Sequence, residues 1–348
     1  MRLLREAPLS CLVLLAYTLC SPIMRRNQHY RDRVNRVLDY VSEHLDGDLS
    51  LARLSAVACF SPFHFHRIFQ GTTGETLNSH VRRVRLERAA LWMRTSPHER
   101  ITDIALKAGF SGTAEFSRAF RNHFGKTASS WDRRSPLEKS KICKAPEMLT
   151  FHTEEELKRW KAANHVRARI LRFSAFRYVY TRIFAPYGNS RLVECYHALT
   201  AWLAKRDTDL RQVVFIGMSL DDPSITPSEH CRYDLGIAFP QEPGGILGEI
   251  VRARGGSARP AASAPQKPEC EAQGLTIRDL TPQQAVSIHC VGDIAHEERA
   301  WHYLYRIWLP SSGFVPADLP AMELFVRLPE EIGWQTFDLE TCIPVVRC

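Results

Sequence analysis

A segment of about 25 residues occurs twice in the first third of the chain, and this repeat constrains the fold more than any other feature. The copies are SLARLSAVACFSPFHFHRIFQGTTG at 50–74 and RITDIALKAGFSGTAEFSRAFRNHFG at 100–125. Ala58 aligns with Ala108, and a Phe-Ser pair follows shortly after in both copies. A helix, a tight turn and a second helix, crossing at a small residue, form a helix-turn-helix unit. The repeat therefore predicts an all-α region with two such units.

The turn and the second helix of each unit follow from residue type. Gly109 suits a turn position with positive φ, and Cys59 takes that place in the first unit. We expect Ser61 and Ser111 to cap the second helices. Helical spacing then separates a core-facing set of side chains from an outward-facing one. The core-facing set is Phe65, Ile68, Phe69, Phe116 and Phe120, and the outward set is Phe63, His66, Arg67, Arg118 and Arg121.

The helix between the two units is predicted to be long and basic. Apolar residues at helical spacing cover 76–94. Residues 24–140 hold 20 Lys and Arg against 12 Asp and Glu, which accounts for the whole net charge of +8. An excess of positive charge that is confined to one part of the chain indicates that this part binds a polyanion. The central helix contributes Arg82, Arg83, Arg85 and Arg88.

Residues 27–134 resemble the AraC family of bacterial transcription regulators, through IALKAGFSGTAEFSRAFRNHFGKTASSWDRR and FHRIFQGTTGETLNSHVRRVRLERA. The resemblance implies a double-stranded DNA-binding domain, 24–134, whose recognition helices enter successive major grooves on one face of DNA. It also makes RNA polymerase a candidate partner. Ala114 stands where a longer residue would read a base, so the second unit is expected to read less sequence. The DNA contacts are assigned to Phe63, His66, Arg67, Thr113, Ser117, Arg118 and Arg121.

Residues 135–165, which include Pro136 and Pro146, are predicted to link this domain to a second one at 166–348. The second domain has its own repeat, offset by about 104 residues, in which YDLGIAFP at 233–240 parallels FDLETCIPV at 337–345. Each half predicts a strand, a helix and two more strands. We therefore expect an α+β domain of two pseudo-symmetric halves, each bringing a sheet, with a ligand cleft at their junction.

IGMSLDDPSITPSEHCRYDLGIAF, at 216–239, resembles the GyrI-like effector-binding domain that follows AraC-type domains in Rob-like regulators. The resemblance implies an aromatic cavity with one acidic residue, and Glu323 stands at that position. A carboxylate among aromatic rings suits a small hydrophobic or cationic effector. The segment 251–274 departs from the family pattern and is predicted to be a disordered insertion. The candidate aromatic contacts are Trp301, Tyr303 and Phe325.

The sequence leaves three functions open for this domain. Effector binding that controls transcription is the leading one. Some stand-alone GyrI-like proteins resemble hydrolases, in which Glu323 would serve as a general base. The third is binding of a protein partner. No catalytic residues are assigned, so we predict that the chain is not an enzyme.

The cysteines and the N-terminal segment favour a cytoplasmic bacterial protein. Ten cysteines show no C-x-x-C pair and no zinc spacing with histidine, so no metal and no cofactor is predicted. Residues 1–23 place Arg2 and Arg5 before an apolar run at 9–20, like a signal peptide, but the cleavage pattern is poor and the run is too short to span a bilayer. We expect this extension to be dispensable, Met24 to be the working start, and no stable membrane association.

Overall fold

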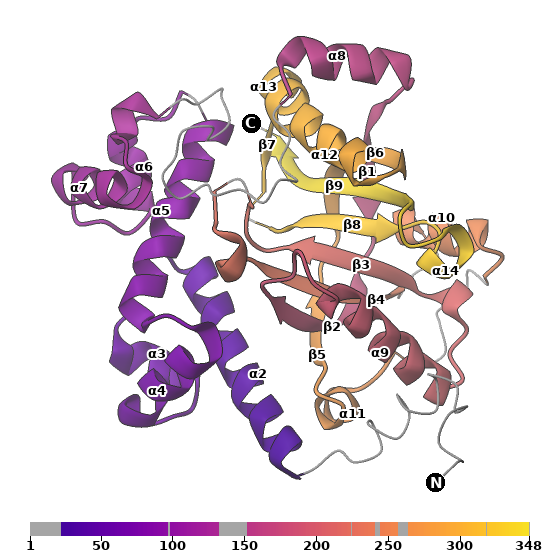
Figure 1. The fold of residues 1–348 in the computed structure, drawn as a ribbon, viewed down its shortest axis with the longest axis horizontal. Helices are drawn as coiled ribbons and strands as arrows, with labels where there is room; N and C mark the ends of the chain where they lie inside the picture. The colour runs from indigo at the N-terminus through magenta and orange to yellow at the C-terminus, as the bar shows by residue number, and fades with distance from the viewer. Residues whose placement is uncertain are drawn as a thin grey trace, which may run out of the picture.

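The computed structural model describes residues 22–96, 98–131, 152–223, 225–240, 244–256, 264–317 and 319–347. Residues 1–21 of the predicted extension and 132–151, which include most of the predicted linker, lie outside the described residues. The described part forms an all-α domain beside an α+β domain (Figure 1). This division confirms the fold class expected from the two internal repeats.

The N-terminal domain consists of two helix pairs at opposite ends of one long helix (Figure 1). Each pair encloses its own apolar core, around Phe65 and Phe69 in the first unit and around Phe116 and Phe120 in the second. All four rings are buried, as their spacing predicts. The helices are α2 (Pro22–Glu43), α3 (Leu51–Val57), α4 (Pro62–Thr73), α5 (Leu77–Thr95), α6 (Ile101–Lys107), α7 (Thr113–Phe124) and the 3-10 turn η1 (Ala128–Ser130).

The turns of the two units have the predicted backbone but not the predicted caps. Gly109 has φ +79°, and Cys59 has φ +54° at the matching position. Ser61 precedes α4 without a capping hydrogen bond from its side chain. The N-cap of α7 is Gly112, while the Ser111 hydroxyl donates to Glu115 over 2.7 Å. Ser61 therefore occupies the predicted N-cap position of α4 but makes no capping hydrogen bond, and the prediction is wrong for Ser111, which lies one residue too early for α7.

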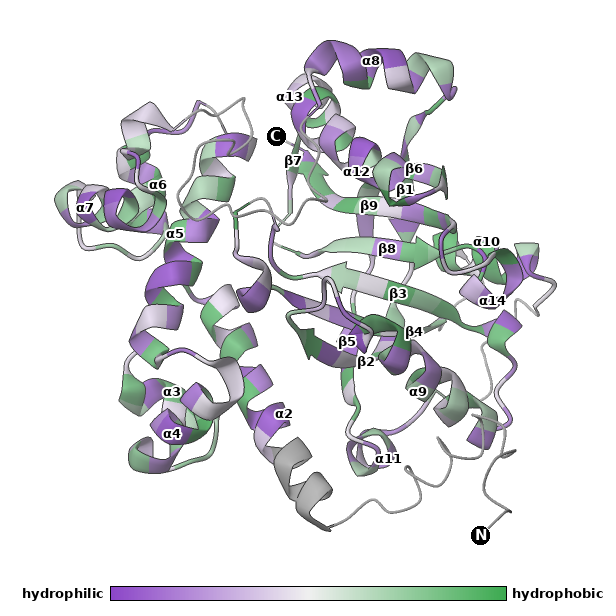
Figure 2. Ribbon diagram, viewed as in Figure 1, coloured by the Kyte–Doolittle hydropathy of each residue, from purple (hydrophilic) through white to green (hydrophobic). Residues whose placement is uncertain are grey.

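The C-terminal domain is built on one antiparallel sheet with helices on both faces. Side chains alternate along β2, so that Tyr178 faces the core under α10 while Val179 faces the core under α9. Figure 2 shows how strongly apolar the central strands are. The strands are β1 (Ala168–Phe173), β2 (Phe176–Phe184), β3 (Val214–Ser219), β4 (Arg232–Pro240), β5 (Thr276–Leu280), β6 (Gln283–Gly292), β7 (Phe314–Pro316), β8 (Ala321–Phe325) and β9 (Phe337–Arg347).

The strand order, β1-β6-β9-β8-β3-β4-β2-β5, has the symmetry that the second repeat predicts. If each strand of one half is replaced by its counterpart in the other half (β1 by β5, β2 by β6, β3 by β8, β4 by β9, and the reverse), the same order is obtained, read from the opposite edge of the sheet. The first strand of each half pairs with the other half, since β1 pairs with β6 and β5 pairs with β2. The expectation of two sheets is wrong, because β3 and β8 pair at the centre, with Met218 opposite Met322. The halves thus share one continuous sheet.

The helices of this domain include two that the sequence did not predict. The predicted helices are α9 (Arg191–Lys205) and α12 (Ile294–Tyr303), which continues as the π-turn η4 (Leu304–Trp308) and α13 (Leu309–Ser312). The ends of the predicted disordered segment form α10 (Gly245–Ala253) and α11 (Lys267–Ala272), so that prediction is wrong there. Val251 and Cys270 anchor these ends in the core, while residues 257–263 lie outside the described part. The remaining helices are α8 (Glu154–Ala163), α14 (Pro329–Ile332) and the short turns η2 (Leu210–Gln212) and η3 (Ser228–His230).

The C-terminal part of the predicted linker belongs to the α+β domain. A capping box between Thr153 and Glu156 starts α8. Leu157 is fully buried against the core beneath α12. The domain boundary therefore lies before α8 and not at residue 165, because the helix buries an apolar side chain that a free linker would expose.

Candidate functional site

The helices predicted to read DNA present the side chains that the sequence selects. On α4, Phe63 is 67% exposed, and the guanidinium of Arg67 lies 4.8 Å from the centre of its ring. His66, on the same helix, is half-buried. On α7, the outward residues are all exposed, namely Thr113, Ser117, Arg118 and Arg121. In Figure 1, α7 lies on the side of α5 away from the sheet, and α4 lies at the lower end of α5 beside α3.

One arginine predicted for the basic surface of α5 is instead part of a buried ion network. Arg83 is 7% exposed and donates to Glu75 over 2.5 Å and to Glu87 over 2.9 Å. His80 contacts the same Glu75 at 2.8 Å. Burial opposes the charge of Glu75, but the hydrogen bonds from His80 and Arg83 outweigh it and lower the pKa of Glu75 to about 2. Burial raises the pKa of Glu87 to about 8 despite the nearby Arg83.

Ion pairs join the helical domain to the α+β domain. Arg182 on β2 is fully enclosed and contacts Asp234 on β4 at 2.7 Å and Asp39 on α2 at 2.8 Å. Near the other end of the interface, Arg94 on α5 pairs with Asp222 at 3.0 Å. The two domains are thus held together by charged side chains from α2 and α5.

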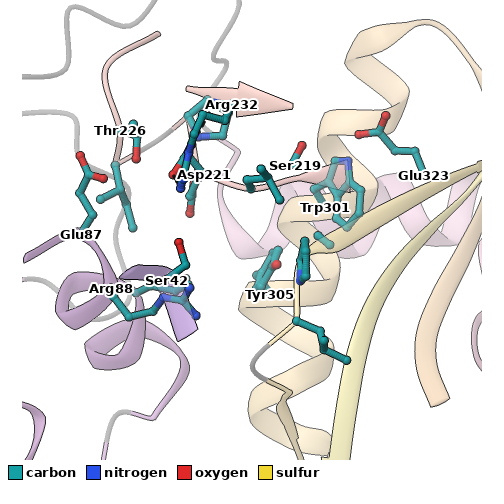
Figure 3. A pocket seen from close by; sticks show the side chains of 18 of the residues that line it. Ser42, Glu87, Arg88, Ser219, Asp221, Thr226, Arg232, Trp301, Tyr305 and Glu323 are labelled. Carbon is teal, nitrogen blue, oxygen red and sulfur yellow. Dashed lines mark hydrogen bonds and ion pairs between the residues drawn. The ribbon is translucent and has the colours of Figure 1, made fainter. Parts of the chain in front are cut away.

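A cavity of about 380 Å³ lies along this interface, within the range typical of small-molecule sites. Figure 3 shows Glu87 and Arg88 on its helical-domain side, with Trp301, Tyr305 and Glu323 across from them. Its inner end lies at the junction of β3 and β8, where the two halves of the sheet meet. The predicted cleft between the halves is therefore present, but it also reaches the other domain.

The inner end of the cavity holds two carboxyl groups in contact. The Tyr233 hydroxyl donates to Glu323, and the Trp301 indole donates to Glu297 over 3.1 Å. Burial raises the pKa of both carboxyl groups, and more strongly that of Glu297. The hydrogen bond between them raises the pKa of Glu297 and lowers that of Glu323. The two groups therefore titrate as a pair, and burial moves the loss of their negative charge to a higher pH than for separate, exposed glutamates.

The structure separates the four predicted effector contacts. Glu323 and Trp301 both line the cavity. Tyr303 is instead buried between α12 and the sheet, and Phe325 packs against the core beneath α9. Neither residue lines this cavity. Tyr303 is two positions after Trp301 on a helix, so the two side chains point in different directions. Phe325 is two positions after Glu323 on β8, so it lies further along the strand, past the end that borders the cavity.

Sequence reasoning missed the partners of the predicted carboxylate. Glu297 precedes Trp301 by one helical turn, so helical spacing alone places both on one face of α12. Tyr233 begins the repeated YDLGIAFP segment, but nothing in that pattern shows that its hydroxyl reaches Glu323. Tyr187 and Tyr305 complete the aromatic lining. The described residues contain no group of three or more His, Cys, Asp or Glu side chains that could hold a metal ion.

A membrane-spanning helix is absent from the described parts of the chain, where no helix combines the necessary length and hydrophobicity.

Comparisons with known families match the two domains separately. The model of a helix-turn-helix domain matches residues 54–134, and that of the GyrI-like small molecule binding domain matches residues 168–346. The Right origin-binding protein of Escherichia coli (strain K12) is 35% identical over 103 residues, which are 30% of this chain and 35% of that protein. An uncharacterised HTH-type transcriptional regulator of Staphylococcus aureus (strain COL) is 41% identical over 93 residues, 27% of this chain and 12% of that protein.

Among solved structures, the C-terminal domain of AraT, a response regulator from Geobacillus stearothermophilus, is 24% identical with a TM-score of 0.28, and the match covers 29% of this chain and 84% of that one. The matched region spans about a third or less of the curated relatives.

Proposed function

Because the chain belongs to the GyrI-like family of small-molecule binding domains, behind a helix-turn-helix domain of the AraC type, we propose that it regulates transcription in response to a lipophilic cation. The observation that carries this proposal is the contact between two carboxyl groups, Glu297 and Glu323, beside aromatic side chains in a cavity that reaches the DNA-binding domain. We assign the negative charge of this pair to Glu323, which also accepts a hydrogen bond from Tyr233. Double-stranded DNA and RNA polymerase are the proposed macromolecular partners. Such a regulator acts in the cytoplasm.

The exposed faces of α4 and α7 support the DNA-binding part of the proposal. Arg67 and Arg118 occupy matching positions on the two helices, and arginine pairs bidentately with guanine in the major groove. Arg67 is held over the Phe63 ring, which limits the orientations of its guanidinium before DNA arrives.

Arg67→Ala is expected to weaken binding to a selected DNA site by about 1–3 kcal/mol and to relax the base preference at one position. The measurement is a binding titration at fixed salt with a duplex selected from a random pool, followed by competition with single-base variants. Arg159→Ala removes the same charge from the exposed surface of α8 and should leave affinity unchanged. Equal affinity and equal base preference for Arg67→Ala would remove Arg67 from the reading surface.

The cavity favours a cation with an aromatic or apolar body. Trp301, Tyr305 and Tyr187 line the cavity together with Glu323, whose side chain is only partly exposed. A bound cation then gains an ion pair and cation–π contact at once. A hydrated metal ion or ammonium ion would lose its water without gaining as many contacts.

Glu323→Gln is expected to weaken tetraphenylphosphonium binding by about 1–3 kcal/mol, because it removes the charge and keeps the shape. Glu297→Gln is the matched control, since an amide at this position keeps the shape of the side chain and can still donate a hydrogen bond to Glu323. Titration calorimetry on the full chain distinguishes the two variants. Neutral triphenylphosphine oxide should bind wild type and Glu323→Gln alike.

The same measurement repeated against pH provides a second test of this assignment. The pKa of Glu323 lies above its ordinary value, so its charge is lost at a higher pH than for an exposed glutamate. The affinity for the cation should be highest at pH values above that pKa, where Glu323 is charged. Below the pKa it should fall about tenfold per pH unit, because the carboxyl group is then protonated. The Glu323→Gln variant should show no such dependence. A similar loss in both glutamine variants would contradict the charge assignment.

One contact favours hydrolysis as a second candidate function. Tyr233 and Glu323 bring a hydroxyl and a carboxylate together, as a general base mechanism requires. Glu323, however, already accepts hydrogen bonds from both Tyr233 and Glu297, which occupy oxygen lone pairs that a general base would offer to a water molecule. We therefore propose binding without turnover, and that the chain is not an enzyme.

A further inference from the structure

The effector cavity has walls from both domains. On α5 of the helical domain, the cavity is lined by Val84, Glu87, Arg88, Leu91 and Arg94, which recur every three or four residues and so form one helix face. Across from it, α12 and η4 present a second such face. That face consists of Ile294, Glu297, Glu298, Trp301, His302 and Tyr305.

The helix α5 connects the two DNA-reading units rigidly. Its N-terminal half contributes Val81 and Val84 to the core of the first unit. Its C-terminal half contributes Leu86 and Met93 to the core of the second unit. The spacing of α4 and α7 therefore depends on α5, and a ligand that contacts α5 touches the element that both units share.

A loop of the α+β domain lines the cavity and also packs against the DNA-binding domain. Asp222 pairs with Arg94, and Thr226 hydrogen-bonds Glu87. Between them, Ile225 is 2% exposed and packs in the core of the second helix-turn-helix unit. All of these residues also line the cavity. The loop thus joins the cavity to α5 by one apolar and two polar contacts.

Building on the function proposed above, we propose that the effector binds between the domains, with its charge at Glu323 and its apolar body against Leu91 of α5, and that its binding is coupled to DNA binding. Leu91 is the one apolar side chain on the middle of the α5 face, and it is only half-buried. A ligand that covers it stabilises one position of α5 against the α+β domain. DNA binds the helices at both ends of α5 and therefore also favours particular positions of α5. The effector and DNA then change each other's affinity by the same factor.

The coupling is measured on the wild-type full chain. Tetraphenylphosphonium is titrated with and without a saturating DNA duplex selected from a random pool. Coupling of this kind changes the dissociation constant by about fivefold or more. Tetramethylammonium, which carries the charge without the aromatic body, should bind weakly and with the same affinity in both states.

Leu91→Ala tests the wall itself. Loss of the apolar contact should weaken tetraphenylphosphonium by about three- to tenfold and reduce the effect of DNA on it, with no effect on tetramethylammonium. Leu106→Ala, at a leucine that is 57% exposed on α6 and outside the cavity, is the matched control and should change neither. Leu91→Met, which keeps an apolar side chain of similar volume, should restore binding if the alanine variant loses stability.

Two results together would overturn the inference. They are unchanged tetraphenylphosphonium binding in Leu91→Ala and equal affinities with and without DNA, while Glu323→Gln still weakens the probe. That pattern would leave the effector site intact within the α+β domain alone. Failure of wild type to bind the probe at all would instead contradict the proposed function.

Discussion

Arg182→Met is expected to lower the free energy of unfolding by about 3–5 kcal/mol, the largest change we predict for a single side chain. The guanidinium lies between Asp234 and Asp39, so it neutralises a carboxylate of its own domain and one of the helical domain. Asp234 is 3% exposed. Burial raises the pKa of Asp234, and the nearby Arg182 is the principal charge that opposes this. Removing Arg182 leaves a buried acid without its counterion.

Arg177→Met is the matched control, because Arg177 lies on the same strand and pairs with Asp279, whose side chain is 62% exposed. An ion pair of that kind contributes about 0–1 kcal/mol. Urea unfolding followed by circular dichroism gives both values. If the two variants lose similar stability, the buried pair does not act as a clamp between the domains. A loss confined to the Arg182 variant, together with looser docking of α2 seen as faster amide exchange, would support the clamp.

Gly109→Ala is expected to destabilise the second helix-turn-helix unit by about 3 kcal/mol or more. At φ +79°, an L side chain costs about 1–2 kcal/mol by itself. The added Cβ would also lie 2.1 Å from the carbonyl oxygen of Leu45 and 2.7 Å from the guanidinium of Arg85. The carbonyl belongs to the backbone and cannot move aside cheaply, so the chain must shift at the turn.

Cys59 provides the internal comparison for this prediction. It occupies the same place in the first unit with φ +54°, so Cys59→Gly should relieve backbone strain and stabilise that unit by about 0.5–1 kcal/mol. Thermal unfolding of both variants measures the two effects. A neutral Gly109→Ala would show that the turn relaxes without loss, and a destabilising Cys59→Gly would mean that the thiol makes contacts that matter more than the backbone strain.

The sequence by itself determined the elements whose signals are local. Helical spacing predicted the burial of Phe65 and Phe116 and the exposure of Arg67 and Arg118, because a helix brings neighbours in sequence onto one face. The two repeats predicted two helix-turn-helix units and two α+β halves. Glu323 was assigned from a resemblance, and its placement in a cavity agrees with that assignment.

Only the tertiary structure decided which distant elements meet. The exchange of β1 and β5 between the halves joins residues more than 90 positions apart, and no periodicity specifies such a pairing. The arginine pattern of α5 is the same whether Arg83 faces water or pairs with Glu75 and Glu87, because helical spacing does not show which residues cover a side chain. For the same reason, the sequence could not show that Glu297 contacts Glu323, or that Leu91 lines the cavity from the other domain. Contacts across an interface arise from packing, and packing is not encoded in any local pattern.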